Sequence, residues 1–496
     1  MTARYIMAID QGTTSTRVVL VDQAGAPAGS VSEELRQIYP QSGWVEHDPM
    51  EIWSSVRDLV GQALEKAGGA DGIGAIGITN QRETTVVWDR SSGEPLCNAI
   101  VWQDRRTADL CRELRAEGLG EDVHSRTGLL IDPYFSGTKL AWMLDTIEGA
   151  RDRANRGELC FGTVDCWLIW KLTGGARHLT DVSNAARTML FDIHKMAWDQ
   201  ALLDQLNIPV EVLPEVVPSQ GVFGTTDPAV IDAELPILGV AGDQQAATFG
   251  QACFEPGMIK STYGTGCFML ANTGTTAVRS DNRLLTTIAW RRGAETLYAL
   301  EGSIFMAGAT IQWLRDSLGL FENAEETEQL AVEADGDSGV YLVPAFVGLG
   351  APYWDPDARA AITGLSRGAG RAEVVRAGLE SVAFQSRDLI EAVAADKASQ
   401  GLGRPDRLRV DGGMVANDWF VQCLADQLGM VVERTRYAES TALGAAYLAG
   451  LEAGVYASLE DLAGQWQSDR VFEPQISEDL RESRYAGWKE AVQRVL

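Results

Sequence analysis

Three short polar turns are the segments of this chain best suited to phosphate chemistry. They start at Asp10, Gly242 and Asp411, and each follows a β-rich or apolar run. Backbone N–H groups and hydroxyls in such turns can bind phosphate oxygens, and an aspartate at a strand end can hold Mg²⁺ directly or through water. One such turn alone is more often an ordinary hairpin. Three in one chain predict a phosphate site.

The better-known nucleotide motifs do not account for these turns. The pattern GxGxxG occurs once, at Gly72–Gly77, where it precedes a strand instead of opening a helix. That context favours a turn followed by strand glycines over a dinucleotide-binding motif. The chain has no GxxxxGK[ST] sequence. Any nucleotide must therefore be bound in another way.

Composition excludes several other classes of protein. The 496 residues include 42 basic and 69 acidic side chains, a net charge of −27, which disfavours binding to nucleic acid or anionic lipid. The seven cysteines form no CxxC pair and the four histidines are dispersed, so no zinc site is predicted. Scattered cysteines among apolar neighbours indicate free thiols in a reducing compartment. Without a signal-like N-terminus or a long apolar run, we expect a cytoplasmic α/β protein.

The elements that must position the turns can be predicted from periodicity. Strands are expected at 5–9, 17–21, 73–79, 84–88, 237–240 and 407–410, and helices at 49–66, 134–147, 245–250, 371–395, 417–428 and 442–451. Residues 258–270 repeat the opening pattern of strand, Gly/Thr turn and strand. This repeat predicts two domains of similar fold, 1–250 and 251–496, with a cleft between them.

A second set of residues could bind a small polyol. Arg82 donates hydrogen bonds and Glu83 accepts them, so together they could fix adjacent hydroxyls. Tyr134 would add a phenol, and Trp102 and Phe268 an apolar wall for the carbon chain. On these residues alone, a surface ion pair and a core tryptophan are the favoured alternative.

Asp243 is the candidate catalytic base, because it ends a strand in a turn that faces the predicted cleft. Its simpler interpretation, a helix N-cap, is compatible with that role.

Several long segments resemble the FGGY carbohydrate kinases, a family with the actin-like ATPase fold. They are AIDQGTTSTRVVL, YFSGTKLAW, GVAGDQQAATFGQ and RVDGGMVANDWFVQCLADQLG, and the resemblance extends from about residue 4 to 455. It implies two actin-like (ribonuclease H-like) α/β domains with a cleft. Segments at 80–85, 100–106, 261–270 and 352–355 are similar to the members that convert glycerol to sn-glycerol 3-phosphate, the first step of glycerol catabolism.

The resemblance also implies roles for individual residues. Glycerol would be bound by Arg82, Glu83, Trp102, Tyr134, Asp243, Gln244 and Phe268. The ATP phosphates would be bound by Thr13, Thr14, Ser15, Arg17, Thr265 and Gly266, and the nucleoside by Gly308, Gln312, Gly413 and Asn417. Asp10 would organise Mg²⁺, with Asp243 as a second candidate. A homo-oligomer, dimer or tetramer, is expected from the same resemblance.

Two alternatives stay open. One is a kinase of another polyol or sugar, and the other is a catalytically silent actin-like nucleotide-binding protein. The presence of Asp10 and Asp243 argues against the silent protein, as does the set Arg82, Glu83 and Trp102.

The segment before the second phosphate motif differs from that of some family members, and this difference leads to a prediction about regulation. Some bacterial members carry an arginine-bearing loop before the second phosphate motif, associated with inhibition by fructose 1,6-bisphosphate, and others carry a phosphorylatable histidine there. Here the segment 223–236 has three carboxylates and no Arg, Lys or His. A ligand with about four negative charges needs charge-assisted donors and would instead meet repulsion. We expect no inhibition by the bisphosphate and no activation by histidine phosphorylation in this segment.

The measurement is the initial rate at saturating ATP and sub-saturating polyol, with and without millimolar bisphosphate, at several protein concentrations. Inhibition that disappears when residues 227–234 are altered would contradict the prediction.

Overall fold

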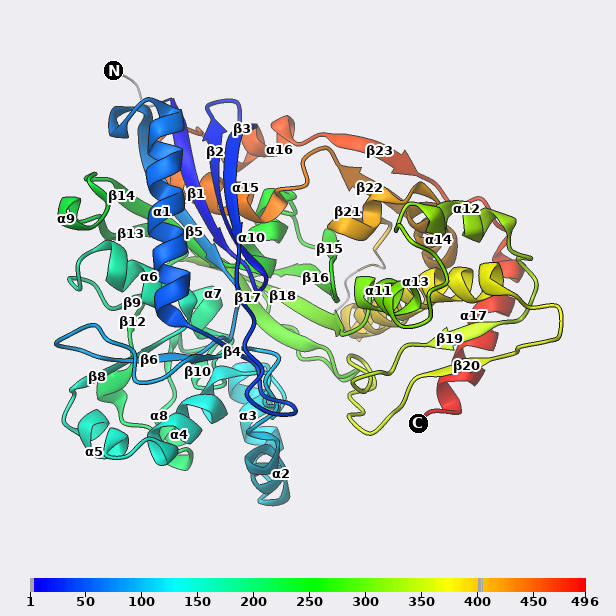
Figure 1. Cartoon of the computed structure of the whole chain (residues 1–496), viewed down its shortest axis with the longest axis horizontal. Coiled ribbons are helices and arrows are strands. Elements are labelled where there is room, and N and C mark those ends of the chain that lie inside the picture. Colours follow the sequence, from blue (N-terminus) through cyan, green and yellow to red (C-terminus); the bar gives the residue numbers. More distant parts are fainter. Residues whose placement is uncertain (1–3, 400–402, 404) are drawn as a thin grey trace.

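A single mixed sheet crosses the molecule from one side to the other (Figure 1). The computed structural model describes residues 4–399, 403 and 405–496. Within these residues the sheet has thirteen strands, in the spatial order β23 (Ser468–Phe472), β22 (Val431–Thr435), β21 (Arg407–Asp411), β15 (Ile259–Tyr263), β16 (Cys267–Gly274), β18 (Glu295–Ile304), β17 (Leu285–Arg292), β13 (Gln220–Thr225), β14 (Pro236–Gly242), β5 (Ile73–Asn80), β1 (Tyr5–Gln11), β2 (Ser15–Asp22) and β3 (Pro27–Glu34).

The same pairing pattern occurs twice in this sheet. In β3–β2–β1–β5–β14 the first two pairings are antiparallel and the next two parallel. In β18–β16–β15–β21–β22 the sequence of pairings is the same. The two sets meet where β13 pairs with β17 through Gln220 and Arg292. The repeat predicted from residues 258–270 is therefore confirmed at the level of strand pairing, whereas the domain boundary at residue 250 stays a prediction.

Helices cover both faces of the sheet (Figure 1). They are α1 (Pro49–Ala67), α2 (Ala108–Ala116), α3 (Gly120–Thr127), α4 (Ser136–Thr146), α5 (Ala150–Asn155), α6 (Val164–Leu172), α7 (Val182–Ala185), α8 (Gln200–Gln205), α9 (Pro228–Ile231), α10 (Asp243–Gly250), α11 (Gly308–Asp316), α12 (Glu326–Glu333), α13 (Arg371–Ser399), α14 (Asp418–Leu428), α15 (Ser440–Glu452), α16 (Leu459–Gln465) and α17 (Glu478–Gln493). Short strand pairs lie outside the sheet: β4 (Glu46–His47) with β7 (Ala99–Ile100), β6 (Val86–Asp89) with β8 (Leu159–Gly162), β9 (Leu179–Asp181) with β12 (Glu215–Val217), β10 (Phe191–Asp192) with β11 (Ala197–Trp198), and β19 (Tyr341–Val343) with β20 (Ala361–Thr363).

Helix α1 shows why the sequence pattern predicts local structure well here. The Asp48 carboxylate accepts from Met50 N at 2.8 Å, Pro49 occupies the first turn, and Gly68 ends the helix with φ of 80°. The apolar face that includes Ile52 and Val56 is buried, and each such aliphatic side chain contributes about 1.5–3 kcal/mol. The expected helix and its cap are confirmed.

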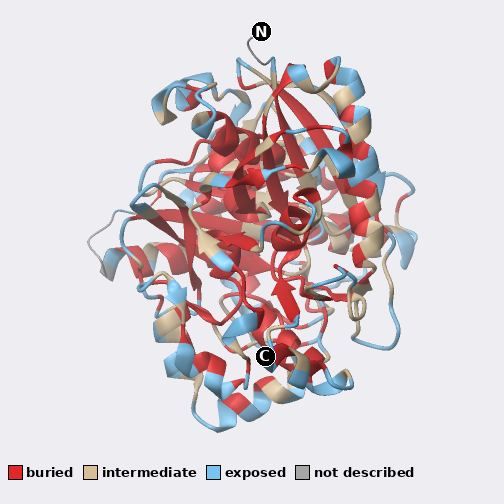
Figure 2. Ribbon diagram, turned by 90° about the vertical axis from the view of Figure 1, so that its left-hand side faces the viewer, coloured by how far each residue is buried: buried red, intermediate tan, exposed pale blue. Residues whose placement is uncertain are grey.

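The small-residue helix α15 packs closely against α10 and β5 because glycines lie at these contacts. A Cβ on Gly444 would lie 1.8 Å from Ala246 O of α10, and one on Gly77 of β5 would lie 2.2 Å from Ala445 O. Gly77 is thus a strand glycine needed for close helix approach, and the dinucleotide-binding alternative for Gly72–Gly77 is excluded by context. Residues of α15 and α10 are buried, as Figure 2 shows for the centre of the molecule.

One predicted strand differs in extent and position. The segment expected at 84–88 forms β6 at Val86–Asp89, which pairs with β8 outside the large sheet. Thr84 and Thr85 instead belong to the turn that follows β5, where Thr84 N donates to Arg82 O. β-Branched residues favour strands locally, but the turn is needed to aim the side chains of residues 82 and 83.

Candidate active site

Two neighbouring parallel strands, β5 and β14, end side by side and carry the predicted polyol and base residues. Asn80 pairs with Gly242 in register, so the segments that follow are adjacent. Arg82 Nε lies 3.3 Å from the Asp243 carboxylate. The Arg82 side chain is 2% exposed, whereas that of Asp243 is 29% exposed and remains reachable. The carboxyl ends of parallel strands are where α/β proteins bind ligands.

Arg82 and Glu83 are buried, so the alternative of a surface ion pair is wrong. Arg82 donates to Tyr134 OH at 3.2 Å and to Gln245 Oε1 at 3.2 Å, and its Nε lies 3.8 Å from Glu83 Oε1. Buried charges persist only when they are paired and hydrogen-bonded. This pair is therefore a hydrogen-bonded part of the interior.

The backbone at Glu83 supports a functional role. Glu83 has φ of 60°, in the left-handed region that costs a residue with a Cβ about 1–2 kcal/mol. Strain of this kind persists only where the surroundings enforce it, and it clusters at ligand sites. Here it turns the Glu83 side chain toward Arg187, whose Nε donates to Glu83 Oε1 at 2.7 Å.

Two further charged residues, Arg187 and Glu301, complete this cluster and were not predicted. Glu301 accepts from Arg82 NH1 at 2.5 Å and NH2 at 3.1 Å, and from Arg187 NH2 at 2.8 Å. Arg187 and Glu301 are each 0% exposed. For Glu301 a sequence signal existed: a lone carboxylate inside the apolar strand β18. Arg187 gave none, because it follows the short helix α7 in an irregular segment.

The two buried glutamates are held in different electrostatic states. Burial raises the pKa of Glu83 above its usual value, although Arg82 and Arg187 oppose that effect. For Glu301 burial acts in the same direction, but Arg187 and Arg82 outweigh it and hold its pKa below the usual value. Glu301 is thus the firmly ionised partner of the arginines.

The three predicted aromatic residues form one wall. The Trp102 ring centroid lies 5.7 Å from that of Tyr134 and 5.9 Å from that of Phe268, both edge to face. Trp102 Nε1 donates to Thr13 Oγ1 at 2.9 Å, which ties the wall to the first phosphate turn. Trp102 is therefore not a simple core residue.

Asp243 is followed by two glutamines with different partners. Gln244 Oε1 accepts from the buried Lys260 Nζ at 2.6 Å, whereas Gln245 contacts Arg82. The structure thus places Gln244 beside Lys260, and its contact with substrate stays a prediction. Burial raises the pKa of Asp243, and the charges of Arg82 and Lys260 oppose the rise. A carboxylate with a raised pKa is a stronger base.

The first phosphate turn joins β1 to β2. Gly12 N donates to Ser15 O at 2.9 Å, and the turn brings Thr13, Thr14 and Ser15 to the end of the hairpin. Arg17 lies 4.0 Å from Glu439 at the surface. Hydroxyls and backbone N–H groups at such a turn fit phosphate oxygens.

Asp10 lies at the end of β1 and interacts electrostatically with Asp243. Burial raises the pKa of Asp10 to about 7, the charge of Asp243 adds to the rise, and Arg17 opposes it. A cation between them would relieve this repulsion, and Mg²⁺ in kinases is often held by one or two carboxylates plus phosphates. The carboxylates therefore fit Mg²⁺. Across residues 4–399, 403 and 405–496, no group of three or more His, Cys, Asp or Glu residues could hold a metal by itself.

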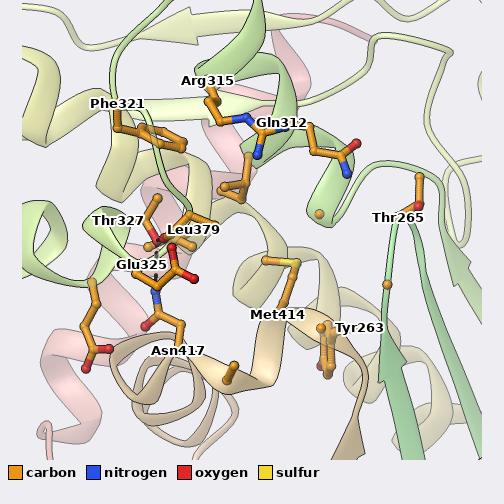
Figure 3. A pocket seen from close by; sticks show the side chains of 17 residues that line it. Tyr263, Thr265, Gln312, Arg315, Phe321, Glu325, Thr327, Leu379, Met414 and Asn417 are labelled. Carbon is orange, nitrogen blue, oxygen red and sulfur yellow. Dashed lines mark hydrogen bonds between the residues drawn. The ribbon is translucent and has the colours of Figure 1, made fainter. Parts of the chain in front are cut away.

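A pocket of about 460 Å³ is lined in part by the turn between β15 and β16. Of the residues predicted for nucleotide binding, Thr265, Gly308, Gln312, Gly413 and Asn417 line it, and Gly266 is adjacent in the β15–β16 turn. Figure 3 shows Gln312 and Thr265 on one side and Asn417 opposite. Asn417 also caps α14, since its side chain accepts from Phe420 N at 2.9 Å.

Other lining residues were missed by the sequence analysis. Phe321, Leu379 and Met414 provide apolar surface, and Arg315 and Thr327 provide polar groups (Figure 3). Apolar walls with few polar groups are typical of nucleoside pockets. Arg315 lies one turn after Gln312 on α11, a helical spacing that could have indicated it. The others come from segments that only the fold brings together.

A buried histidine supports the first phosphate turn from behind. His47 Nε2 is 2.9 Å from Gln37 Oε1, and its Nδ1 is 3.2 Å from Gln81 Nε2. Gln37 in turn donates to Thr13 O at 2.8 Å, and Gln81 to Gly12 O at 3.1 Å. Burial lowers the pKa of His47 to about 4, so the ring is neutral at neutral pH.

Two family models match the chain. The N-terminal domain of the FGGY family of carbohydrate kinases matches residues 5–250, and its C-terminal domain matches residues 259–453. Among similar proteins, glycerol kinase of Alcanivorax borkumensis is 58% identical over 99% of this chain and 98% of its own length. Glycerol kinase 1 of Pseudomonas aeruginosa is 56% identical over 99% of both chains.

Solved structures agree with these matches. Glycerol kinase of Plasmodium falciparum with ADP has a TM-score of 0.93 and 37% identity, covering 100% of this chain and 98% of that one. A xylulose kinase of Lactobacillus acidophilus has a TM-score of 0.89 at 24% identity over 99% and 98%, which shows the same fold only. No helix in the described residues is long and apolar enough to cross a membrane.

Acid should destabilise the protein through His47. The folded state keeps this ring neutral down to about pH 4, whereas in the unfolded chain it takes up a proton below its ordinary value of 6.5. Stability is therefore present above pH 6.5 and is lost as the pH falls toward 4, by up to about 3 kcal/mol. The measurement is the melting temperature of wild type and His47→Gln from pH 4 to pH 8. The wild type should lose more on acidification, and the exposed His194→Gln should behave as wild type. Equal acid sensitivity of wild type and His47→Gln would refute the assignment.

Proposed function

The chain belongs to the FGGY family of carbohydrate kinases, and we propose that it transfers the γ-phosphoryl group of ATP to glycerol, giving sn-glycerol 3-phosphate and ADP. The observation that carries the proposal is the buried Arg82–Glu83 pair beside Asp243 and the aromatic wall. Curated glycerol kinases match over the full length of the chain.

Glycerol fits the site because its three hydroxyls need fixed partners and its carbon chain needs an apolar surface. We assign Arg82 as a hydroxyl donor, Glu83 as an acceptor, and Tyr134 as a further polar contact. Trp102 and Phe268 cover the carbon edge, and Gln244 stays a candidate contact. A site that pairs every hydroxyl rejects analogues lacking one, because its own buried polar groups would be left unpaired.

Asp243 is assigned as the general base. The substrate hydroxyl oxygen forms a bond to the γ-phosphorus while the bond from that phosphorus to the ADP oxygen breaks, and the hydroxyl proton passes to the Asp243 carboxylate. Its raised pKa favours proton uptake. Arg82, 3.3 Å away, holds the carboxylate in place.

The ATP-binding residues are assigned on both sides of the cleft. Thr13, Thr14, Ser15 and Arg17 would contact phosphates from the β1–β2 hairpin, and Thr265 and Gly266 from the β15–β16 turn. The nucleoside would occupy the pocket containing Gly308, Gln312, Gly413 and Asn417. Asp10, with Asp243 nearby, would hold Mg²⁺, which when bound neutralises phosphate charge.

The remaining expectations are proposals of the same kind. Residues 1–250 and 251–496 would act as two domains that close on the substrates, since phosphoryl transfer requires orientation and exclusion of water. The seven free cysteines fit the expected cytoplasmic location. Assembly into a dimer or tetramer is expected from the family.

A substrate panel tests the activity. ADP release is measured with glycerol, dihydroxyacetone, xylulose and gluconate offered separately, and without any acceptor. We expect glycerol to give kcat/KM at least about 100-fold above that for xylulose or gluconate, because the longer ketose and the sugar acid cannot satisfy the same buried partners. A preference for xylulose would favour a sugar kinase, and ADP release independent of acceptor would favour a nucleotide-binding protein without this activity.

Replacing the base should remove turnover but not binding. Asp243→Asn keeps the side-chain size and loses the proton acceptor, so kcat should fall by about 10²–10⁴-fold. Isothermal titration should still detect ATP and glycerol binding. The exposed Asp232→Asn is the matched control and should keep wild-type kcat. A near wild-type kcat in Asp243→Asn would remove this residue from the mechanism.

A further inference from the structure

Glu301 occupies an unusual place for a carboxylate. It lies in β18, which is paired on both sides: Leu270 of β16 and Leu285 of β17 are its register partners. The side chain is fully buried among apolar strand residues. Pairing on both sides holds the backbone of Glu301 in place, and a buried charge there is strongly unfavourable unless it is fully paired.

Both carboxylate oxygens of Glu301 are used by arginines of the other half of the chain. Oε2 accepts from Arg82 NH1 at 2.5 Å, and Oε1 accepts from Arg82 NH2 at 3.1 Å and from Arg187 NH2 at 2.8 Å. The contact with Arg82 is therefore bidentate, which fixes the orientation of the guanidinium plane as well as its position. With NH1 and NH2 held from behind, the Arg82 Nε edge faces Asp243 at 3.3 Å.

The same carboxylate frees Glu83 for another partner. Arg187 is shared between Glu301 and Glu83, and its Nε contacts only one oxygen of Glu83, Oε1 at 2.7 Å. Glu301 is hydrogen-bonded to both arginines and uses both of its oxygens to do so. Glu83 is then left with acceptor capacity for a substrate hydroxyl.

Strand β18 also leads directly to the nucleotide pocket. Beyond its last residue, Ile304, the chain reaches Ala307, whose N donates to Thr265 O at 3.0 Å, and Gly308, whose N donates to Gly264 O at 2.9 Å. Gly264, Thr265 and Gly308 line that pocket. Gly308 is thus only seven positions after Glu301, the anchor of Arg82, and the first part of the connecting segment is the paired strand β18.

We propose that Glu301 is a positioning residue for the phosphoryl transfer: from the nucleotide-binding half it orients Arg82, and through Arg187 it orients Glu83, toward the polyol and the base. Glu301 itself does not touch substrate, because it is completely buried behind both arginines. The inference rests on the proposed glycerol kinase activity. It adds a specificity-determining residue that lies outside the substrate contacts.

The test compares wild type with two variants. Glu301→Gln keeps the shape of the side chain but removes its charge and one acceptor. Glu301→Asp keeps the charge but places the carboxylate one methylene further from the arginines. Glu295→Gln, exposed on the same strand, is the control. Steady-state constants are measured with glycerol, 1,2-propanediol and 1,3-propanediol, and ADP binding is measured by titration.

We expect Glu301→Gln to raise KM for glycerol at least about tenfold and to lower kcat, with ADP affinity within about threefold of wild type. The preference for glycerol over the two diols should fall at least about tenfold, because a misaligned Arg82 no longer forms a favourable hydrogen bond with the third hydroxyl. Glu301→Asp should lie between wild type and Glu301→Gln, and Glu295→Gln should match wild type.

A purely structural role would give a different result. A lower melting temperature in Glu301→Gln, with KM and the preference for glycerol unchanged in the folded protein, would overturn the inference. Failure of both Glu301 variants to fold would also overturn it. Wild-type kinetics in Glu301→Gln would overturn it equally. Failure of the wild type itself to phosphorylate glycerol would overturn the proposed function instead, so the two are distinguishable.

Discussion

Mutual neutralisation of four buried charges, Arg82, Arg187, Glu83 and Glu301, is the constraint on which the architecture depends. Any one of them left alone in the interior would cost several kcal/mol, so all must arrive together and with good geometry. They come from three separate segments: the turn after β5, the segment after α7, and strand β18. The sheet that carries both β5 and β18 holds these segments in register.

The duplicated sheet supplies that rigidity and also places the phosphate turns. Each copy of the pairing pattern begins with a hairpin, β1–β2 or β15–β16, and each hairpin ends in a Gly/Thr turn. Helices α10 and α15 pack closely against each other because Gly250 and Gly444 lie at their contact. Two similar halves therefore present two Gly/Thr turns, the proposed phosphate sites, and relative motion of the halves would change the distance between them.

Local elements could be predicted from the sequence, but the partners of the buried charges could not. The Asp48–Pro49 cap, the hairpins and the amphipathic helices depend on neighbouring residues, and the structure has them where periodicity indicates. Arg82 and Glu301 are 219 residues apart, and Arg187 and Glu83 are 104 apart. Neither separation leaves a periodic signal. Without those partners, Arg82 and Glu83 resemble an exposed pair, which is why their burial required the fold.

The proposed role of Asp243 as a base depends on how its neighbours affect the pKa of its carboxylate. A guanidinium 3.3 Å from a carboxylate lowers the pKa of that carboxylate and weakens it as a proton acceptor. Yet burial keeps the pKa of Asp243 above its usual value despite Arg82 and Lys260. Because Glu301 accepts from both terminal nitrogens of Arg82, much of the arginine's charge is neutralised on the side away from Asp243. Under the proposed function, Arg82 can therefore stand beside the base and hold it in place, while burial keeps the Asp243 carboxylate basic.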